Sequence, residues 1–336
     1  MLKFFRISIF ITVASILIAL FELGPAAAYT TIVLIAIEIA FSFDNAIINA
    51  KVLERLSRLW QQLFLTIGMI FAIVGMRFVF PILIVMVTAN LPWSTVVDEA
   101  LHDPAAYGEH LEAAHAAIAS FGGAFLLTLT LYFFFDTARK DFWLKRFEKG
   151  LLKVGGTFWL PPLLSALIVI ILGYFAGEDK TTVLQSGLVG VAAYSGIKLL
   201  IDSLGRLAPK EQKIYTGWPA FFAFMYLQIL DASFSFDGVL GAFAITDKVL
   251  LIALGLGVGA IWVRSLTVYF VRHGTLNSYK YLEHGAHYAI FVLAAALLGS
   301  IYYEVPDAIT GIVGIGVIVA SFISSREAKR AKEKHA

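Results

Sequence analysis

The sequence predicts an all-α protein, a polytopic transmembrane helix bundle of about ten spans that contains an inverted three-helix repeat. Three observations lead to this fold class. Hydrophobic residues make up 59% of the 336 residues and charged residues only 15%, whereas soluble domains carry about 25% charged residues. Apolar runs of about 20 residues, long enough to cross a bilayer, recur along the chain. An acidic motif inside these runs occurs twice, in corresponding places.

The apolar runs place the expected spans in order along a single membrane domain, residues 1–336. The spans lie near residues 5–23, 28–50, 60–87, 118–136, 159–176, 182–202, 219–245, 248–271, 286–303 and 305–323. The first run follows a basic start and ends near three alanines, so it also resembles a cleavable signal peptide. We favour a retained span over cleavage of residues 1–28, which would leave nine spans in the same orientation.

Lys and Arg are divided very unevenly between the expected loops. With both termini in the cytoplasm, 21 of the 26 basic residues lie inside, and only Lys180 and Lys248 lie in outside loops. Because cytoplasmic loops carry an excess of Lys and Arg, this split predicts an integral protein of a bacterial inner (cytoplasmic) membrane with both termini cytoplasmic. The lipid bilayer is then the expected partner, and no nucleic-acid partner is expected.

One sizeable outside segment, near residues 88–117, is acidic and contains histidines. Such a segment can attract cations to the membrane surface, but a solvated amphipathic segment is the interpretation that we favour.

The repeated motif is E-I-A-F-S-F-D at Glu38–Asp44 and D-A-S-F-S-F-D at Asp231–Asp237. A charge at membrane depth costs about 2.5–3.5 kcal/mol or more, so intramembrane acids mark functional sites by default. Structural salt bridges alone would explain these four acids less well, because basic residues are scarce within the predicted membrane spans. The duplicated acids therefore predict a cation site.

The similarity between the two halves continues beyond the acids. Gly68 corresponds to Gly255, Arg77 to Arg264, and F-G-G-A around Gly123 to E-H-G-A around Gly285. Repeat one therefore covers about 28–136 and repeat two about 219–303. Five spans separate the starts of the copies, and this odd number gives them opposite orientations, the architecture of many secondary transporters.

Helix geometry places Glu38, Ser42 and Asn45 on one face, and likewise Asp231 and Ser235. Asp44 lies about 120° away from that face and about 9 Å along the axis on a regular helix. Either each helix breaks near F-S-F-D, which we favour, or the second acid faces a different neighbour. Broken helices are usual at transporter binding sites.

Inverted pairing would bring the oxygen-bearing residues of both copies together. The expected metal ligands are Glu38, Asp44, Asn45, Asp231 and Asp237, with Ser42 and Ser235 as neutral oxygens. The chain has no cysteine, and such oxygen ligands suit Mg²⁺, Ca²⁺ or Mn²⁺. One divalent ion leaves two negative charges, to be balanced by protons, a second cation, or Arg77 and Arg264. The arginines can instead stabilise the fold by pairing with a carboxylate or a helix C-terminus.

A separate cluster, Glu283, His284 and His287, lies at the expected inside end of the ninth span. His284 and His287 are three residues apart and share a helical face, and His titrates near neutral pH. The cluster predicts either a cytoplasmic access or proton-relay site or a simple interfacial cap.

F-S-F-D-N-A at Asp44-Asn45, the G-x-x-x-x-x-x-x-x-R spans after each copy and F-G-G-A resemble the TerC family, integral membrane proteins grouped with LysE-type exporters. Y-L-E-H-G-A-H-Y, Tyr281–Tyr288, is similar to a related branch catalogued as a domain of unknown function. The resemblance implies metal-ion export, chiefly of manganese, with the acids of both repeats as ligands. It carries over best onto Asp44 and Asp237. The second copy departs from the pattern by having Gly238 where the first has Asn45.

The sequence thus favours a secondary transporter that exports a divalent cation, with Mn²⁺ the favoured ion. Exchange for protons is one way to couple this export, since crowded carboxylates release protons as metal binds. The alternatives are a metal-dependent membrane-embedded enzyme and a scaffold of a metal- or tellurite-resistance complex. No enzyme activity and no prosthetic group is expected, because no H-E-x-x-H or Ser/Lys signature is present; the metal is substrate.

Overall fold

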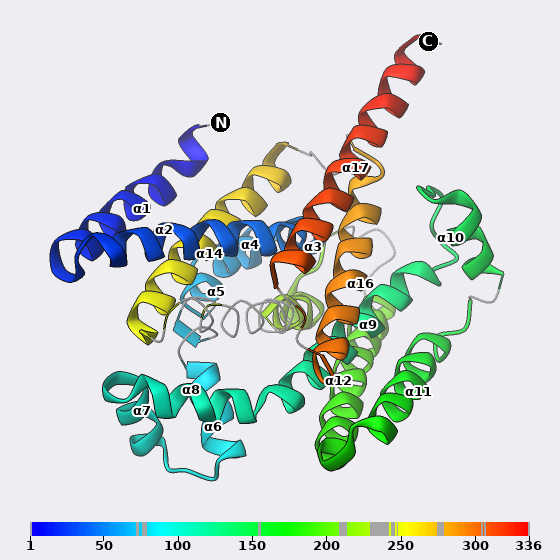
Figure 1. Ribbon diagram of the computed structural model, residues 1–336. Helices are drawn as coiled ribbons and strands as arrows, with labels where there is room; N and C mark the ends of the chain where they lie inside the picture. Colours follow the sequence, from blue (N-terminus) through cyan, green and yellow to red (C-terminus); the bar gives the residue numbers. More distant parts are fainter. Residues whose placement is uncertain are drawn as a thin grey trace. The chain divides into compact units, whose positions relative to one another are not determined.

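The computed structural model of the 336-residue chain is built from helices (Figure 1). It describes all residues except 1, 72–73, 76–78, 154–155, 208–213, 229–241, 243–245, 247, 274–278, 304, 306 and 335–336. Over the described residues no β-strand is present, and a single isolated parallel bridge joins Leu56 and Tyr215. The predicted fold class, a helical membrane bundle, is confirmed.

Most of the predicted spans appear as long helices. Five described helices are apolar enough and long enough to cross a membrane: α1 (Leu2–Leu23), α9 (His115–Phe134), α12 (Lys180–Leu207), α14 (Val249–His273) and α16 (Leu282–Ser300). α11 (Leu160–Phe175) is apolar but shorter. α17 (Asp307–Lys334) continues past the predicted end at 323, because the Ala-, Lys- and Glu-rich tail consists of good helix formers.

Two predicted spans are interrupted. The 28–50 span consists of α2 (Pro25–Phe41) and α3 (Phe43–Leu53), separated at Ser42, where φ is −95° and ψ is 12°. The break predicted near the first F-S-F-D is therefore confirmed, while the second copy lies outside the described residues. The 60–87 span contains α4 (Arg58–Leu65), α5 (Ile67–Ile70) and α6 (Phe80–Thr88). Of the 219–245 span, the structure describes chiefly a helix at 217–228.

The segment predicted as amphipathic forms two short helices, α7 (Trp93–His102) and α8 (Pro104–Ala113). Asp103 accepts a hydrogen bond from the Ala106 amide at 3.3 Å, which caps α8, and Pro104 occupies its first turn, where the missing N–H costs nothing. Val96 and Ala100 are buried, whereas His102 and Asp98 form an exposed pair at 2.9 Å. This division between buried apolar and exposed polar side chains agrees with the amphipathic interpretation.

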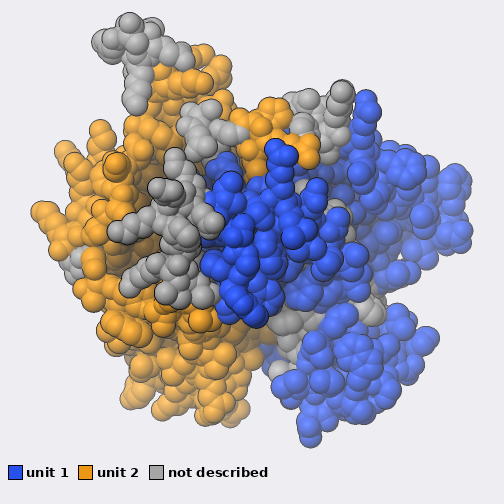
Figure 2. Space-filling view, turned by 180° about the vertical axis from the view of Figure 1, so that it is seen from behind, with its two compact units in different colours: residues 1–115, 212–269 blue, residues 116–211, 270–336 orange. Residues whose placement is uncertain are grey.

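The chain divides into two compact units, coloured separately in Figure 2. Unit 1 comprises residues 1–115 and 212–269, and unit 2 comprises residues 116–211 and 270–336. Of the three boundaries, 115/116 falls between the second and third predicted spans of repeat one, 211/212 precedes repeat two, and 269/270 falls at the end of the second predicted span of repeat two. Each predicted repeat therefore has its first two spans chiefly within the residue ranges of unit 1 and its third span within those of unit 2.

In unit 1, α1 turns into α2 at Gly24, whose φ of 90° favours glycine. α1 also contacts α14 through polar side chains. The hydroxyls of Ser8 and Ser265 are 2.7 Å apart, and Trp262 donates its indole N–H to Thr12 at 2.8 Å. These contacts satisfy polar groups between apolar helices, where an unpaired group is costly.

In unit 2, glycines allow the helices to approach closely. Gly123 of α9 lies against Leu298 of α16, and Gly285 of α16 lies against Ser321 of α17. Small residues are frequent at interfaces between membrane helices, because packing there depends on close contact rather than on a hydrophobic driving force. The two glycines that the sequence comparison paired thus both serve helix packing.

Candidate functional site

Glu38 is the best-described member of the predicted cation site. It lies in the last turn of α2 with only 2% of its surface exposed, and the Ser42 hydroxyl donates a hydrogen bond to its Oε1 at 2.9 Å. The prediction that these two residues share a helical face is confirmed. Ser42 is also where the helix is interrupted, so the hydroxyl at the break orients the buried carboxylate.

α14 leaves no room for a side chain beside Glu38. A Cβ placed on Gly259 would stand 2.5 Å from the Glu38 Cγ, and one placed on Gly255 would stand 2.5 Å from the Leu34 Cβ. Because Gly255 and Gly259 are four residues apart, they form one glycine face along α14. This face determines how closely the α14 backbone approaches the acidic turn of α2.

Arg264, buried with 5% exposure, contacts the interrupted second span of repeat one. Its Nη1 donates to the Phe64 carbonyl at 2.6 Å, and its guanidinium lies 4.1 Å from the centroid of the Phe64 ring. α4 ends at Leu65, so this carbonyl belongs to a helix C-terminus, where cations are favourable. The structure thus supports the helix-terminus role for Arg264, and its charge-balancing role stays a prediction.

The close glycine contacts of unit 1 are reciprocal between the repeats. Gly68 of repeat one lies against Gln228 of repeat two, while Gly255 of repeat two lies against Leu34 of repeat one. Gly68 and Gly255 correspond to each other in the two predicted repeats. The acids of the two repeats are 193 residues apart, and the same offset makes Leu227, the neighbour of Gln228, the counterpart of Leu34. The two contacts thus involve neighbouring rather than identical positions of the two predicted repeats, and the two-fold relation between the repeats stays a prediction.

Sequence analysis overlooked Gln228. It is 3% exposed, and neither its amide nitrogen nor its amide oxygen has a hydrogen-bond partner. A Cβ on Gly68 would stand 2.8 Å from its Nε2 and 3.4 Å from Arg264 Nη1. Its position three residues before Asp231 was the signal that could have identified it.

The remaining predicted ligands are not covered by the structure. The side chains of Asp44 and Asn45, and residues Arg77, Asp231, Ser235 and Asp237, lie outside the part that is described. Of the predicted metal ligands, the structure therefore describes the side chains of Glu38 and Ser42 only. Among the described residues, no three His, Asp or Glu side chains are placed to hold a metal ion together.

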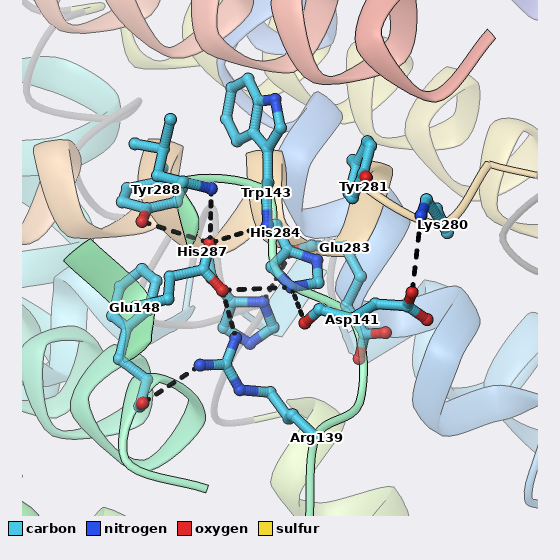
Figure 3. A network of polar contacts seen from close by, with 12 residues as sticks. Arg139, Asp141, Trp143, Glu148, Lys280, Tyr281, Glu283, His284, His287 and Tyr288 are labelled. Atoms are coloured by element: carbon cyan, nitrogen blue, oxygen red, sulfur yellow. Dashed lines mark hydrogen bonds and ion pairs between the residues drawn. The ribbon is translucent and has the colours of Figure 1, made fainter. Parts of the chain in front are cut away.

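A second polar centre, which the sequence predicted only in part, surrounds Glu148 of α10 (Lys145–Leu152) in unit 2 (Figure 3). The Glu148 side chain is completely buried, and its Oε2 accepts from Arg139 at 3.0 Å. Its Oε1 accepts from the Trp143 and Leu144 amides, both at 3.1 Å. The carboxylate thus satisfies free N–H groups at the start of α10.

His284 of α16 joins this centre. Its Nε2 lies 2.8 Å from the Asp141 carbonyl and 3.3 Å from Glu148 Oε2. A carbonyl only accepts, so Nε2 carries the proton. These contacts join residues 139–148 to the start of α16 and favour the interfacial-cap interpretation of the histidine cluster.

The other two predicted members of the cluster are arranged differently. His287 donates from Nδ1 to the Glu283 carbonyl at 2.8 Å, and its ring stacks on Phe133 with centroids 3.6 Å apart. The Arg139 guanidinium is 4.3 Å from the centroid of the same Phe133 ring. Because His287 occupies one face of the ring, Arg139 must lie over the other. The histidines are thus held by packing and backbone contacts.

The electrostatics of Glu148 follow from these partners. Burial by itself would raise the pKa of Glu148, but the hydrogen bond and charge of His284, the Leu144 amide and the Arg139 charge together lower it below its ordinary value. Glu148 is therefore ionised at neutral pH. The sequence signal for it was weak, because Glu148 is one of two acids, with Asp141, in a loop that is otherwise rich in bases.

Comparison with known proteins identifies the family. Residues 43–332 match the family described as "Protein of unknown function (DUF475)". A segment of 98 residues is 28% identical to the "Uncharacterized membrane protein YceF" of Bacillus subtilis (strain 168), covering 29% of this chain and 37% of that relative. The chain thus matches little more than a third of the relative's length. No solved structure gives a significant match. The chain is an integral membrane protein that belongs to the DUF475 family.

Proposed function

We propose that the protein is a secondary transporter that exports a divalent cation, with Mn²⁺ the favoured substrate and Ca²⁺ and Mg²⁺ the alternatives. The observation that carries the proposal is Glu38, a carboxylate 2% exposed at an interruption of an apolar helix. Its Ser42 bond and its close packing against Gly259 hold it in place. Buried acids at helix breaks are features of ion-coupled transporters.

The packing of unit 1 supports a site shared by both repeats. The second helix of each repeat contacts the first helix of the other, at Gly68–Gln228 and Gly255–Leu34. Transporters with inverted repeats bind their ions at such an interface, near the midplane. In the proposal, Asp44, Asp231 and Asp237 complete the ligand set of Glu38.

The TerC-type motifs support the same function, since the resemblance of this chain to the TerC family implies metal export. We assign the protein to the LysE-type exporter group on this basis, in a bacterial inner membrane with both termini cytoplasmic. Proton exchange is part of the proposal, because metal binding displaces protons from clustered carboxylates. Metal uptake should therefore respond to an imposed pH gradient.

The test is Mn²⁺ flux through the purified full-length chain in liposomes that contain a Mn²⁺-quenched dye. Wild type should transport Mn²⁺, and Glu38→Gln, which removes the charge but keeps the shape, should not. Glu109→Gln changes an exposed acid of α8 and should transport like wild type. Equal flux in wild type, Glu38→Gln and protein-free liposomes would contradict the proposal.

A further inference from the structure

The α10 helix of unit 2 carries basic side chains along one side, here called the basic stripe. Helical residues three, four and seven apart lie on the same side, and this spacing groups Lys145, Arg146, Lys149 and, just after the last turn, Lys153. All four residues are exposed. Among the residues that the structure describes, no acid forms an ion pair with any of them. The stripe is therefore a row of four uncompensated positive charges.

The two acids within residues 137–153 do not neutralise the basic stripe. Glu148 is completely buried, with Arg139 at 3.0 Å and His284 at 3.3 Å from its carboxylate (Figure 3). Asp141 lies 3.6 Å from the Lys280 ammonium. Because these contacts hold Glu148 inside, they also fix the rotation of α10 about its axis. The helix is thus held with the basic stripe outward.

Exposed apolar side chains accompany the basic stripe. Leu144 and Phe147, three residues apart, are 46% and 53% exposed, and Trp159, immediately before α11, is 59% exposed. Trp is enriched where membrane and water meet. Helices that combine a Lys- and Arg-rich face with Leu, Phe or Trp lie in the surface of a bilayer. The side chains of α10 are thus typical of a helix that rests on lipid headgroups.

The neighbouring helices in the chain keep α10 close to a bilayer. α9, which is apolar and long enough to cross a membrane, precedes it, and the apolar α11 follows it. Segments next to membrane helices that contain four to eight Lys or Arg residues attract anionic lipids. Residues 137–153 contain six. A nucleic acid would match this charge but would leave the exposed Leu144 and Phe147 without an apolar partner, so a lipid surface fits better.

We propose that the basic stripe of α10 binds the anionic phospholipid headgroups of the surrounding bilayer, with Leu144 and Phe147 entering the boundary between headgroups and acyl chains. Each base near such a surface favours it about fivefold over a neutral residue. The buried contacts of Glu148 then serve to present the stripe to the lipid. This interaction is independent of the proposed transport function.

The test measures which lipid lies next to α10 in the full-length chain, held in phosphatidylcholine nanodiscs. The chain has no cysteine, so Gly150→Cys provides a unique site for a fluorophore, at a position where a Cβ meets nothing within 4 Å. Gly150 is four residues from Arg146 and so lies beside the stripe. Thr181→Cys, an exposed position beyond the other end of α11 and close to Glu178, is the control. Small amounts of nitroxide-labelled phosphatidylglycerol or phosphatidylcholine then quench the fluorophore.

The anionic quencher should associate with position 150 about fivefold or more strongly than the neutral quencher, and about 0.5 M salt should weaken this preference. At position 181 the two quenchers should be equivalent. A wild-type stripe that shows no preference for phosphatidylglycerol would overturn the proposal without any further variant. Binding of a short DNA duplex in place of a lipid preference would assign the stripe to nucleic acid and would also overturn it.

Two combined variants separate charge from structure. Changing Lys145, Arg146, Lys149 and Lys153 together to Gln should abolish the preference at position 150. The melting temperature should stay close to that of wild type, because these side chains form no ion pair. Changing the three lysines to Arg keeps the charge and should keep the preference. An undiminished preference in the Gln variant would show that the stripe does not bind the lipid.

Discussion

Gly259 of α14 lies directly against Glu38 of α2, so closely that a Cβ on the glycine would stand 2.5 Å from the Glu38 Cγ and 3.2 Å from the Ile35 carbonyl oxygen. The contact joins the second helix of repeat two to the acidic turn of repeat one. A buried carboxylate held by a neighbouring backbone has few alternative positions. The glycine is therefore as much a part of the candidate site as the acid.

Gly259→Ala should disturb both the fold and the site. The added methyl forces Glu38 or the α14 backbone to move, which we expect to cost about 1–3 kcal/mol of stability and to abolish Mn²⁺ flux. Gly316→Ala is the control, because a Cβ at Gly316 of α17 meets nothing within 4 Å. Thermal melting and liposome flux measure the two effects, and wild-type behaviour of Gly259→Ala would disprove the tight contact.

Asp44→Asn and Asp237→Asn should each abolish metal tolerance while leaving membrane insertion intact. Each change removes a proposed ligand charge and at the same time lowers the cost of placing the segment in the bilayer. Growth in toxic Mn²⁺, intracellular metal content and membrane-fraction yield are the measurements. Asp98→Asn, which alters an exposed residue of α7, should grow like wild type. Normal efflux by both purified variants would refute the predicted site.

Arg264→Ala should destabilise the protein by about 1–3 kcal/mol, because it leaves the buried Phe64 carbonyl without this donor. It also removes the stacking of the guanidinium on the Phe64 ring. Arg326→Ala, at an exposed position of α17, should change stability by less than about 0.5 kcal/mol. Equal melting temperatures for the two variants would show that the helix-terminus contact contributes no stability.

Glu148 should make stability depend on pH in the acidic range. Its folded-state pKa is lowered from 4.5, so its stabilising effect is present above the unfolded pKa and is lost as pH falls through the folded pKa. Glu148→Gln should cost about 3–5 kcal/mol at neutral pH, since it leaves Arg139 buried without its carboxylate. The melting-temperature difference from wild type should then shrink as the pH falls below about 4.5. A difference that is constant with pH would show that the Glu148 charge is not stabilising.

Much of the fold could be predicted because the bilayer imposes strong constraints on sequence. The long helices α1, α9, α14 and α16 fall on predicted spans, since each needs about 20 apolar residues. The break at Ser42 was also predictable, because a regular helix turns Asp44 away from Glu38. The interruption of the 60–87 span was not, as its apolar run contains no charge or proline near Thr66.

The acids of the candidate site could be predicted from the sequence, whereas the residues that pack against them could not. Repetition revealed Glu38 and Asp44, but nothing local distinguishes Gly259 from the other glycines of α14, and only the spacing of three residues to Asp231 distinguishes Gln228 from an ordinary polar residue. Glu148 likewise lies in a loop dominated by bases, and its partner His284 is 136 residues away along the chain.

The sequence by itself determined that this is a helical membrane protein with a duplicated acidic motif, because composition, span length and internal repetition can be read without knowing any contact. Only the tertiary structure decided that Gly259 packs on Glu38, that Arg264 binds the Phe64 carbonyl, and that Gln228 is buried without a partner. Each of these depends on residues far apart in the chain, and their close packing follows from the mutual placement of helices, which local periodicity does not specify.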